Sequence, residues 1–295
     1  PIILEKDNEC IWFVNEKVIK FSDDKEFIKN RVKRSKLIKD FVPEITDTSE
    51  NMYAYKKVDG EVLSNKVNIP KFINLLEASS IFWKDIELSR EELNNFKNKC
   101  LDFYKVKTEK RINLFFNKFH HKDTITYING ERIPKIEDLI LELDWNNLKD
   151  GIPSEFHGDF HFENILYSYK SKKFIFLDWR QDFANNIKCG DRYYDLAKLM
   201  HGLIVNHKII QDNLYSINWS NDEINFDLNR KFNLVQCENY FISWLNNNNY
   251  SSRKVYLLTS LIYLNIAGLH HYPYSELLFS LGKSMLYQNM QQVYK

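Results

Sequence analysis

The chain contains one short segment whose residue types and spacing suit phosphoryl-transfer chemistry. Asp159 is followed five residues later by Asn164, and Asp178 ends an apolar run that begins at Phe174. In such a reaction one carboxylate orients a hydroxyl group and takes its proton, while an amide oxygen and a second carboxylate hold Mg²⁺ on nucleotide phosphates. The pattern therefore predicts Asp159 as the catalytic base and Asn164 and Asp178 as metal ligands.

The residues around these three indicate how they are positioned. Two apolar runs, 165–167 and 174–177, flank the polar residues 170–173, which is typical of a β-hairpin. Such a hairpin would hold Asn164 and Asp178 at the ends of neighbouring strands.

The rest of the chain divides into a sheet-rich front and a mainly helical body. Runs of β-branched and aromatic residues predict the front sheet, and apolar residues at helical spacing predict the body. Asn129-Gly130 is a strong signal for a two-residue hairpin, and the polar residues 213–229 are expected to interrupt the helices. The predicted elements are strands at 2–4, 10–14, 17–21 and 52–55, a helix capped within 22–24 that stops by Pro43, two long helices between 70 and 120, and mainly helices from 194 to 295.

Composition excludes some classes of partner. The chain has 295 residues with 41 basic and 40 acidic side chains, so its formal net charge is +1. This balance gives no electrostatic reason to expect a nucleic-acid or membrane-surface protein. The four cysteines form no closely spaced pair, and no apolar run approaches the roughly 20 residues that span a bilayer. Without a recognisable signal peptide, a cytoplasmic location is expected.

A family resemblance appears at the catalytic segment. Residues 157–164 (HGDFHFEN) resemble the catalytic loop of the aminoglycoside phosphotransferase and choline kinase family, and residues 177–179 (LDW) resemble its metal-binding segment. The resemblance implies a two-lobed, protein-kinase-like α+β fold, with a nucleotide-clamping lobe at 1–58 and a catalytic and substrate-binding lobe at 59–295. It also implies transfer of the γ-phosphoryl group of ATP, with GTP left open and Mg²⁺ as cofactor, to a hydroxyl of a small metabolite.

The same resemblance assigns front-lobe residues to nucleotide binding. Lys20 stands where the third-strand lysine of kinases reaches the α and β phosphates; the alternative is a solvent-facing strand lysine. The usual partner of that lysine is a helix glutamate, but this chain has Asn30 and Arg31 at the corresponding distance. Glu26 is therefore taken as the nearest acidic substitute.

The loop over the phosphates departs from the kinase pattern. No glycine precedes Gly60, so the loop at 5–9 lacks a glycine-rich cover, and side chains such as Asn8 are expected to help hold the nucleotide. Residues 55–60 would form the hinge whose backbone meets the adenine.

Two residues are expected to support the catalytic segment rather than to react. His157 would brace the loop through hydrogen bonds. Asp195 would cap the helix that begins at Leu196 and brace the same loop.

Arg180 is a clue to the acceptor. Choline and aminoglycoside kinases tend to have an acidic residue just after the metal-binding Asp-aromatic pair, whereas this chain has a guanidinium there. The hypothesis is a neutral or anionic acceptor bound partly by Arg180, with Asp191 as a second candidate in the acceptor site. The alternative is that Arg180 forms a structural pair with Asp191 or Asp182.

A more specific resemblance concerns a branch of the family. Residues 190–199 (GDRYYDLAKL), together with residues 178–180, look most like the branch found beside, or fused to, sugar nucleotidyltransferases in bacterial capsule and surface-polysaccharide pathways. This branch implies a role in surface-polysaccharide precursor synthesis and a covalently linked nucleotidyltransferase domain preceding Pro1.

Two other classes stay open at this stage. A pseudokinase or binding module would keep the fold without turnover. The missing helix glutamate and glycine loop favour it, whereas the intact set of Asp159, Asn164 and Asp178 argues against it. A metal-dependent hydrolase could use His157, Asp159 and His161 as ligands of a transition metal, but it leaves Asn164, Asp178 and Lys20 unexplained.

Overall fold

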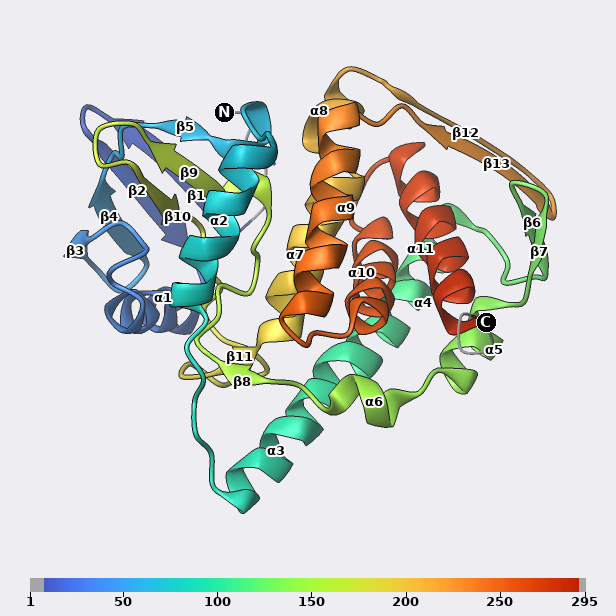
Figure 1. Cartoon of the computed structure of the whole chain (residues 1–295), viewed down its shortest axis with the longest axis horizontal. Coiled ribbons are helices and arrows are strands. Elements are labelled where there is room, and N and C mark those ends of the chain that lie inside the picture. Colours follow the sequence, from blue (N-terminus) through green and yellow to red (C-terminus); the bar gives the residue numbers. More distant parts are fainter. Residues whose placement is uncertain (1–7, 292–295) are drawn as a thin grey trace.

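The computed structural model describes residues 8–291 and shows a small sheet packed beside a larger helical body (Figure 1). Its strands and turns of 3-10 helix are β1 (Glu9–Val14), β2 (Lys17–Ser22), β3 (Ile45–Thr48), β4 (Met52–Lys56), β5 (Glu61–Val62), η1 (Leu63–Asn65), β6 (Thr126–Ile128), β7 (Glu131–Ile133), β8 (Pro153–Ser154), η3 (Phe162–Asn164), β9 (Ile165–Ser168), β10 (Lys173–Phe176), β11 (Gly190–Asp191), β12 (Tyr215–Ser220) and β13 (Glu223–Leu228). Its other helices are α1 (Lys25–Leu37), α2 (Ile69–Phe82), α3 (Arg90–Leu101), the π-helical turn η2 (Asp102–Val106), α4 (Lys107–Phe119), α5 (Ile136–Glu142), α6 (Trp145–Lys149), α7 (Arg192–Ile204), α8 (His207–Gln211), α9 (Phe232–Asn247), α10 (Ser252–Ala267) and α11 (Tyr274–Gln291).

The front sheet has the antiparallel order β1-β2-β4-β3. Lys20 lies in the inner strand β2, opposite Ile11 of β1 and Tyr53 of β4. The strand predicted at 2–4 and most of the loop predicted at 5–9 lie outside the described residues.

Helix α1 connects the second and third strands of this sheet. It begins where the sequence predicts, because the side chain of Asp24 accepts hydrogen bonds of 3.0 Å from the backbone N–H groups of Glu26 and Phe27. It ends at Leu37, six residues before Pro43. Two arginines of α1, Arg31 and Arg34, reach the loop that follows β10.

The chain leaves the front sheet through Gly60 and at once joins the predicted catalytic hairpin. Strands β9 and β10 pair antiparallel, as predicted, and β5 adds to the other edge of β9. A Cβ atom at Gly60 would lie 2.5 Å from the carbonyl oxygen of Tyr167, so a side chain there would collide with the backbone of β9.

The helical body is built around α7 and α10. Nearly every residue of α7 is buried, no residue of α10 is exposed, and α10 also packs against α11 and α4. Figure 1 shows these helices together on the side of the molecule away from the front sheet. The hairpin predicted around Asn129-Gly130 is present as β6 and β7.

One expected interruption of the helices is a second hairpin. Residues 213–229 contain β12 and β13, which pair antiparallel, and β13 runs parallel to β6. On β12 the half-buried Tyr215, Ile217 and Trp219 alternate with exposed polar residues. This period of two, characteristic of a half-buried strand, was present in the sequence but was hidden by the polar composition.

No helix among residues 8–291 is both long enough and apolar enough to cross a lipid bilayer.

Candidate active site

The catalytic segment folds so that Asp159, Asn164 and Asp178 lie around one point. The Asn164 amide Nδ2 donates hydrogen bonds to the backbone oxygen of Asp159, at 2.9 Å, and to its Oδ2, at 3.1 Å. The backbone N–H of Leu177 donates to the backbone oxygen of Asn164 at 2.7 Å, which brings Asp178 beside it. Asp178 has a φ of +57°, a left-handed conformation that is uncommon outside glycine and that concentrates at functional sites.

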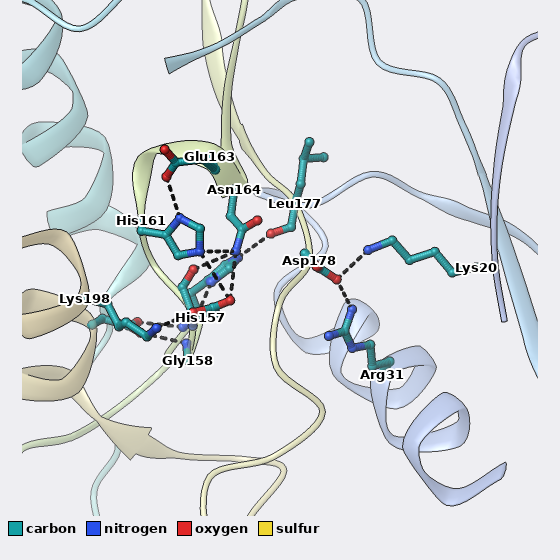
Figure 2. Close-up of polar contacts among 12 residues, drawn as sticks. Lys20, Arg31, His157, Gly158, His161, Glu163, Asn164, Leu177, Asp178 and Lys198 are labelled. Atoms are coloured by element: carbon teal, nitrogen blue, oxygen red, sulfur yellow. Dashed lines mark hydrogen bonds and ion pairs between the residues drawn. The ribbon is translucent and has the colours of Figure 1, made fainter. Parts of the chain in front are cut away.

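Lys20 reaches across from the front sheet to Asp178. Its Nζ donates to Oδ1 of Asp178, and the guanidinium of Arg31 on α1 donates to the same oxygen (Figure 2). Although burial by itself raises the pKa of Asp178, Lys20 and Arg31 hold it well below its ordinary value. Asp178 is therefore ionised at neutral pH, and Lys20 faces the catalytic segment rather than bulk solvent.

Arg31 takes the place where the sequence analysis sought an acidic partner for Lys20. Its side chain is 9% exposed and also contacts the hydroxyl of Tyr53 at 3.3 Å. Glu26 instead has a side chain 63% exposed and pairs with Lys29 at 2.9 Å. The expectation that Glu26 partners Lys20 is wrong, because Glu26 lies in the first turn of α1 on its solvent side, whereas Arg31 lies on the face toward Asp178.

Helix α1 is tied to the catalytic segment at further points. Arg34, one turn after Arg31, is almost fully buried, and its guanidinium donates to the backbone oxygens of Phe156 and Arg180. The indole N–H of Trp179 donates to the backbone oxygen of Arg31 at 3.0 Å. These bonds to a buried guanidinium and a buried indole hold α1 against the loop that carries Asp178.

Asn8 lies at the edge of the described residues. Its side chain is exposed, and its backbone oxygen accepts from the N–H of Asp23 at 3.2 Å. Its predicted contact with a nucleotide stays a prediction, because most of the loop to which it belongs lies outside residues 8–291.

Asp159 is bonded by two positively charged groups. Nζ of Lys198, on α7, lies 2.8 Å from Oδ1 of Asp159, and Nε2 of His161 lies 3.4 Å from Oδ2. Although burial by itself raises the pKa of Asp159, Lys198 and His161 hold it well below its ordinary value. The Asp159 side chain is still 37% exposed, so an ionised carboxylate remains open to an incoming hydroxyl group.

His161 keeps its charge through two carboxylates. Its Nδ1 lies 2.8 Å from Oε2 of Glu163, and its Nε2 faces Asp159 (Figure 2). Although burial by itself lowers the pKa of His161, Asp159 and Glu163 raise it to about 9. His161 was predicted to act only in the hydrolase alternative, and in the structure it lies between Glu163 and Asp159.

His157 is neutral and braces the loop. Its Nδ1 accepts the backbone N–H of Asp159 at 3.2 Å, so its Nε2 carries the proton and donates to the backbone oxygen of Leu177 at 2.8 Å. Burial lowers the pKa of His157 to about 3. Because both ring nitrogens are engaged, His157 is not free to bind a transition metal.

Asp195 holds the other side of the same loop. Its two carboxylate oxygens accept the backbone N–H of His157 at 2.6 Å, that of Gly158 at 2.7 Å, and the indole N–H of Trp83 at 3.1 Å. Burial raises the pKa of Asp195 to about 6, so the group is ionised at neutral pH. Helix α7 begins at Arg192, so Asp195 lies within its first turn and is not its N-cap.

The N-cap of α7 is Asp191, which was predicted as an acceptor-binding residue. Its carboxylate accepts the backbone N–H groups of Tyr193 at 3.0 Å and Ile152 at 2.9 Å, and the hydroxyl of Tyr104 at 2.6 Å. Asp191 is buried, and these partners occupy both of its oxygens. The prediction for Asp191 is therefore wrong, because the residue stabilises the start of a helix.

Arg180 lies on the loop after Asp178, in contact with the catalytic loop. Its backbone N–H donates to the backbone oxygen of His157 at 2.8 Å. A Cβ atom at Gly158, whose φ is +86°, would lie 2.6 Å from Cβ of Arg180, so only glycine allows this approach.

The alternative, a structural pairing of Arg180 with Asp191 or Asp182, is not found among residues 8–291. Asp182 accepts the backbone N–H of Asn185 at 2.9 Å, and the oxygens of Asp191 are engaged as described above. The guanidinium of Arg180 instead lies over the ring of Phe103, with 5.0 Å between Cζ and the ring centre.

The oxygen donors of this site fit Mg²⁺. Carboxylate and amide oxygens are the ligands that Mg²⁺ prefers in proteins. Asp178 binds the side chains of Lys20 and Arg31 through Oδ1. Its side chain is 41% exposed, so Oδ2 is available to a metal ion. The amide nitrogen of Asn164 donates to Asp159, whereas its amide oxygen points away from His161 in Figure 2. Within the described part of the chain, no cluster of three or more His, Cys, Asp or Glu side chains is arranged for a metal.

Comparison with solved structures gives the fold. The chain matches the ternary complex of APH(2″)-IIa with streptomycin and ATP at a TM-score of 0.52 and 14% identity, over 97% of this chain and 90% of that chain. The chain has a kinase-like fold. The prediction of a kinase-like α+β architecture is thereby confirmed, whereas the lobe boundary at 58 stays a prediction.

Two further similar structures are an ethanolamine kinase and a choline kinase. An ethanolamine kinase of Plasmodium vivax matches at a TM-score of 0.46 and 14% identity, over 98% of this chain and 84% of that chain. A choline kinase from Cryptosporidium parvum Iowa II matches at a TM-score of 0.45 and 12% identity, over 98% of this chain and 87% of that chain. No protein-family model matches the chain, and no curated protein matches it either.

Proposed function

We propose that the chain is an ATP-dependent kinase that transfers the γ-phosphoryl group to a hydroxyl of a small metabolite. One observation carries the proposal: Asp159, Asn164 and Asp178 lie together on a kinase-like fold, and a lysine of the front sheet, Lys20, reaches Asp178. A structural aspartate needs none of these partners, whereas phosphoryl transfer needs all of them.

The roles follow from the contacts. Asp159, ionised and partly exposed, accepts the hydrogen bond of the acceptor hydroxyl and receives its proton as the new bond forms between the acceptor oxygen and the γ-phosphorus. The bond from the γ-phosphorus to the bridging oxygen breaks, and the nucleoside diphosphate leaves. Asn164 and Asp178 would hold Mg²⁺, which neutralises phosphate charge, and Lys20 would bind the phosphates. Positioning and charge neutralisation account for the catalysis.

Arg31 makes the nucleotide site more cationic than the usual lysine–glutamate pair. With Arg31 in place of a glutamate, two cations face Asp178. Two cations would favour a polyphosphate, and ATP, with GTP left open, is the proposed donor.

The biological setting is proposed from sequence alone. Residues 190–199 resemble the capsule-associated branch of the family, so the product would be a precursor of a surface polysaccharide. The acceptor would be a sugar, a sugar acid, or an amino-acid or amino-alcohol derivative.

The test measures nucleotide binding and turnover separately. Thermal unfolding with ATP, with and without Mg²⁺, should show stabilisation that requires the metal, and Asp178→Asn should remove the metal-dependent part. ATP consumption is then screened against sugars, sugar acids, polyols, amino acids and amines. Asp159→Asn should lower turnover about 10²- to 10⁴-fold while ATP still binds.

The competing classes predict different results. A binding module without activity would bind ATP and Mg²⁺ but consume no ATP with any acceptor class, and Asp159→Asn would change nothing. Stabilisation by a transition metal that ignores nucleotide would favour a hydrolase.

A further inference from the structure

A cluster of cations lies around Phe103 and Tyr194, and one of its members, Lys198, contacts Asp159. Lys198 is bonded to Asp159, and Lys107 and Arg180 lie against one aromatic ring, that of Phe103. Nζ of Lys107 is 4.4 Å from the ring centre, and Cζ of Arg180 is 5.0 Å from it. Cations from α4 and from the loop after β10 therefore meet at Phe103, and Lys198 of α7 bonds to Asp159.

The buried phenol of Tyr194 responds to the same three cations. Tyr194 lies one turn before Lys198 on α7 and packs edge-on against Phe103, with 5.0 Å between ring centres. Although burial by itself raises the pKa of Tyr194, the three cations lower it below its ordinary value. Their charges thus act on one small region.

This region lacks the acidic partners that usually balance buried cations. Among residues 8–291, neither Lys107 nor Arg180 has a carboxylate within ion-pair distance, and Nε of Arg180 is buried without a hydrogen-bond partner. Burial and the neighbouring cations lower the pKa of Lys107. Arg111, one turn after Lys107, adds a further positive charge, and the acidic residue in the adjoining surface hollow is the exposed Asp102. Half-buried cations without counter-charges are costly unless a ligand supplies them.

We propose that Lys107, Arg180 and Arg111, with Lys198 beside the catalytic carboxylate, form an acceptor subsite for an anionic group, a carboxylate or a phosphate. The inference rests on the proposed function and narrows its acceptor to a hydroxylated anion, such as a sugar acid, a hydroxy acid or a phosphorylated sugar. A cationic amino alcohol would be repelled. The π-helical turn η2 lies directly before Lys107 and carries Phe103; such turns often occur at functional sites.

The test uses inorganic sulfate as the anionic probe, with Mg²⁺ and a non-hydrolysable ATP analogue filling the nucleotide site. Calorimetric titration at constant ionic strength should show saturable binding of sulfate but not of choline. Lys107→Met and Arg180→Gln should each weaken sulfate binding about tenfold, whereas Lys107→Arg should retain it. Lys170→Met, at an exposed lysine in the turn between β9 and β10, is the matched control and should bind as the unmodified protein does.

Each outcome decides the question. Three results would overturn the anionic subsite while leaving the kinase proposal intact. They are the absence of saturable sulfate binding, sulfate binding that is unchanged in both Lys107→Met and Arg180→Gln, and preferential binding of choline. Failure of the ATP analogue and Mg²⁺ to bind, measured first and without any acceptor, would contradict the proposed function and the subsite with it. Thermal unfolding of each variant confirms that a loss of binding is not a loss of fold.

Discussion

Replacing Asp195 by asparagine tests whether one buried carboxylate holds the catalytic loop in place. Asp195 is fully buried and accepts three N–H donors, two of them from the backbone of His157 and Gly158, directly before Asp159. Asparagine keeps the shape of the side chain but replaces one acceptor oxygen by an NH₂ group. Whichever way the amide turns, at least one donor then faces another donor.

The contacts show which orientation of the asparagine amide has the lower energy. Oδ2 accepts from both His157 and Trp83, whereas Oδ1 accepts from Gly158 alone, so the NH₂ group should take the position of Oδ1. This loses one charge-assisted hydrogen bond and leaves the buried N–H of Gly158 unpaired. We expect a loss of about 2–4 kcal/mol in the free energy of unfolding. Because the loop then shifts Asp159, turnover should fall at least about tenfold.

Urea denaturation at pH 7.5 measures the stability of Asp195→Asn, and ATP consumption measures its turnover. Asp212→Asn, at an exposed position after α8, is the matched control and should change stability by less than about 0.5 kcal/mol. A loss below about 0.5 kcal/mol in Asp195→Asn would refute the reasoning, because the three hydrogen bonds would then not hold the loop. Lost stability with unchanged turnover would refute only the positioning of Asp159.

Three further predictions follow from the described contacts. Glu26→Gln should leave the KM for ATP within about twofold, since Glu26 lies in solvent. Lys20→Met should raise the KM for ATP about tenfold or more. A large effect of Glu26→Gln in steady-state kinetics would contradict the assignment of Arg31 as the residue facing Asp178. Gly60→Ala should lower the melting temperature, with a loss of about 1–3 kcal/mol, because its Cβ meets the backbone of β9; an unchanged melting temperature would show that the segment yields freely. The folded-state pKa of His157 lies below the value near 6.5 of an unfolded histidine, so the folded state binds fewer protons. The free energy of unfolding should therefore fall as the pH drops below 6.5 toward 3, by at most about 1.4 kcal/mol per pH unit. The same pH dependence in His157→Gln would be evidence against a buried neutral imidazole.

Local patterns predicted the elements that carry the chemistry. The hairpin of β9 and β10 follows from alternating apolar residues around a polar turn, and Asp24 caps α1 because its side chain reaches two N–H groups of the same helix end. Each of these interactions joins residues close together in the chain, so spacing alone specifies it. The hairpin of β12 and β13 was missed because its exposed face is polar enough to resemble a loop.

Partners that lie far apart in the chain were harder to predict. Arg31 stands where a glutamate was sought, so its position was noticed, but its bond to Asp178 depends on how α1 packs against the loop after β10. Lys198 follows Asp195 by one helical turn, a spacing that puts both on one face of α7, and this signal could have placed Lys198 near the catalytic loop. No comparable signal relates Lys107 to Arg180.

The sequence by itself determined the hairpin that carries Asn164 and Asp178, because motif spacing and hairpin register are local properties, and the resemblance at residues 157–164 implied the kinase-like α+β class. Only the tertiary structure decided the charges around them. The front sheet and α1 place Lys20 and Arg31 on Asp178, and α4 and α7 place Lys107 and Lys198 beside Arg180 and Asp159. A net charge of +1 conceals this arrangement, since electrostatic energy depends on the distance between charges and on their burial, and both are set by packing between segments far apart in the chain.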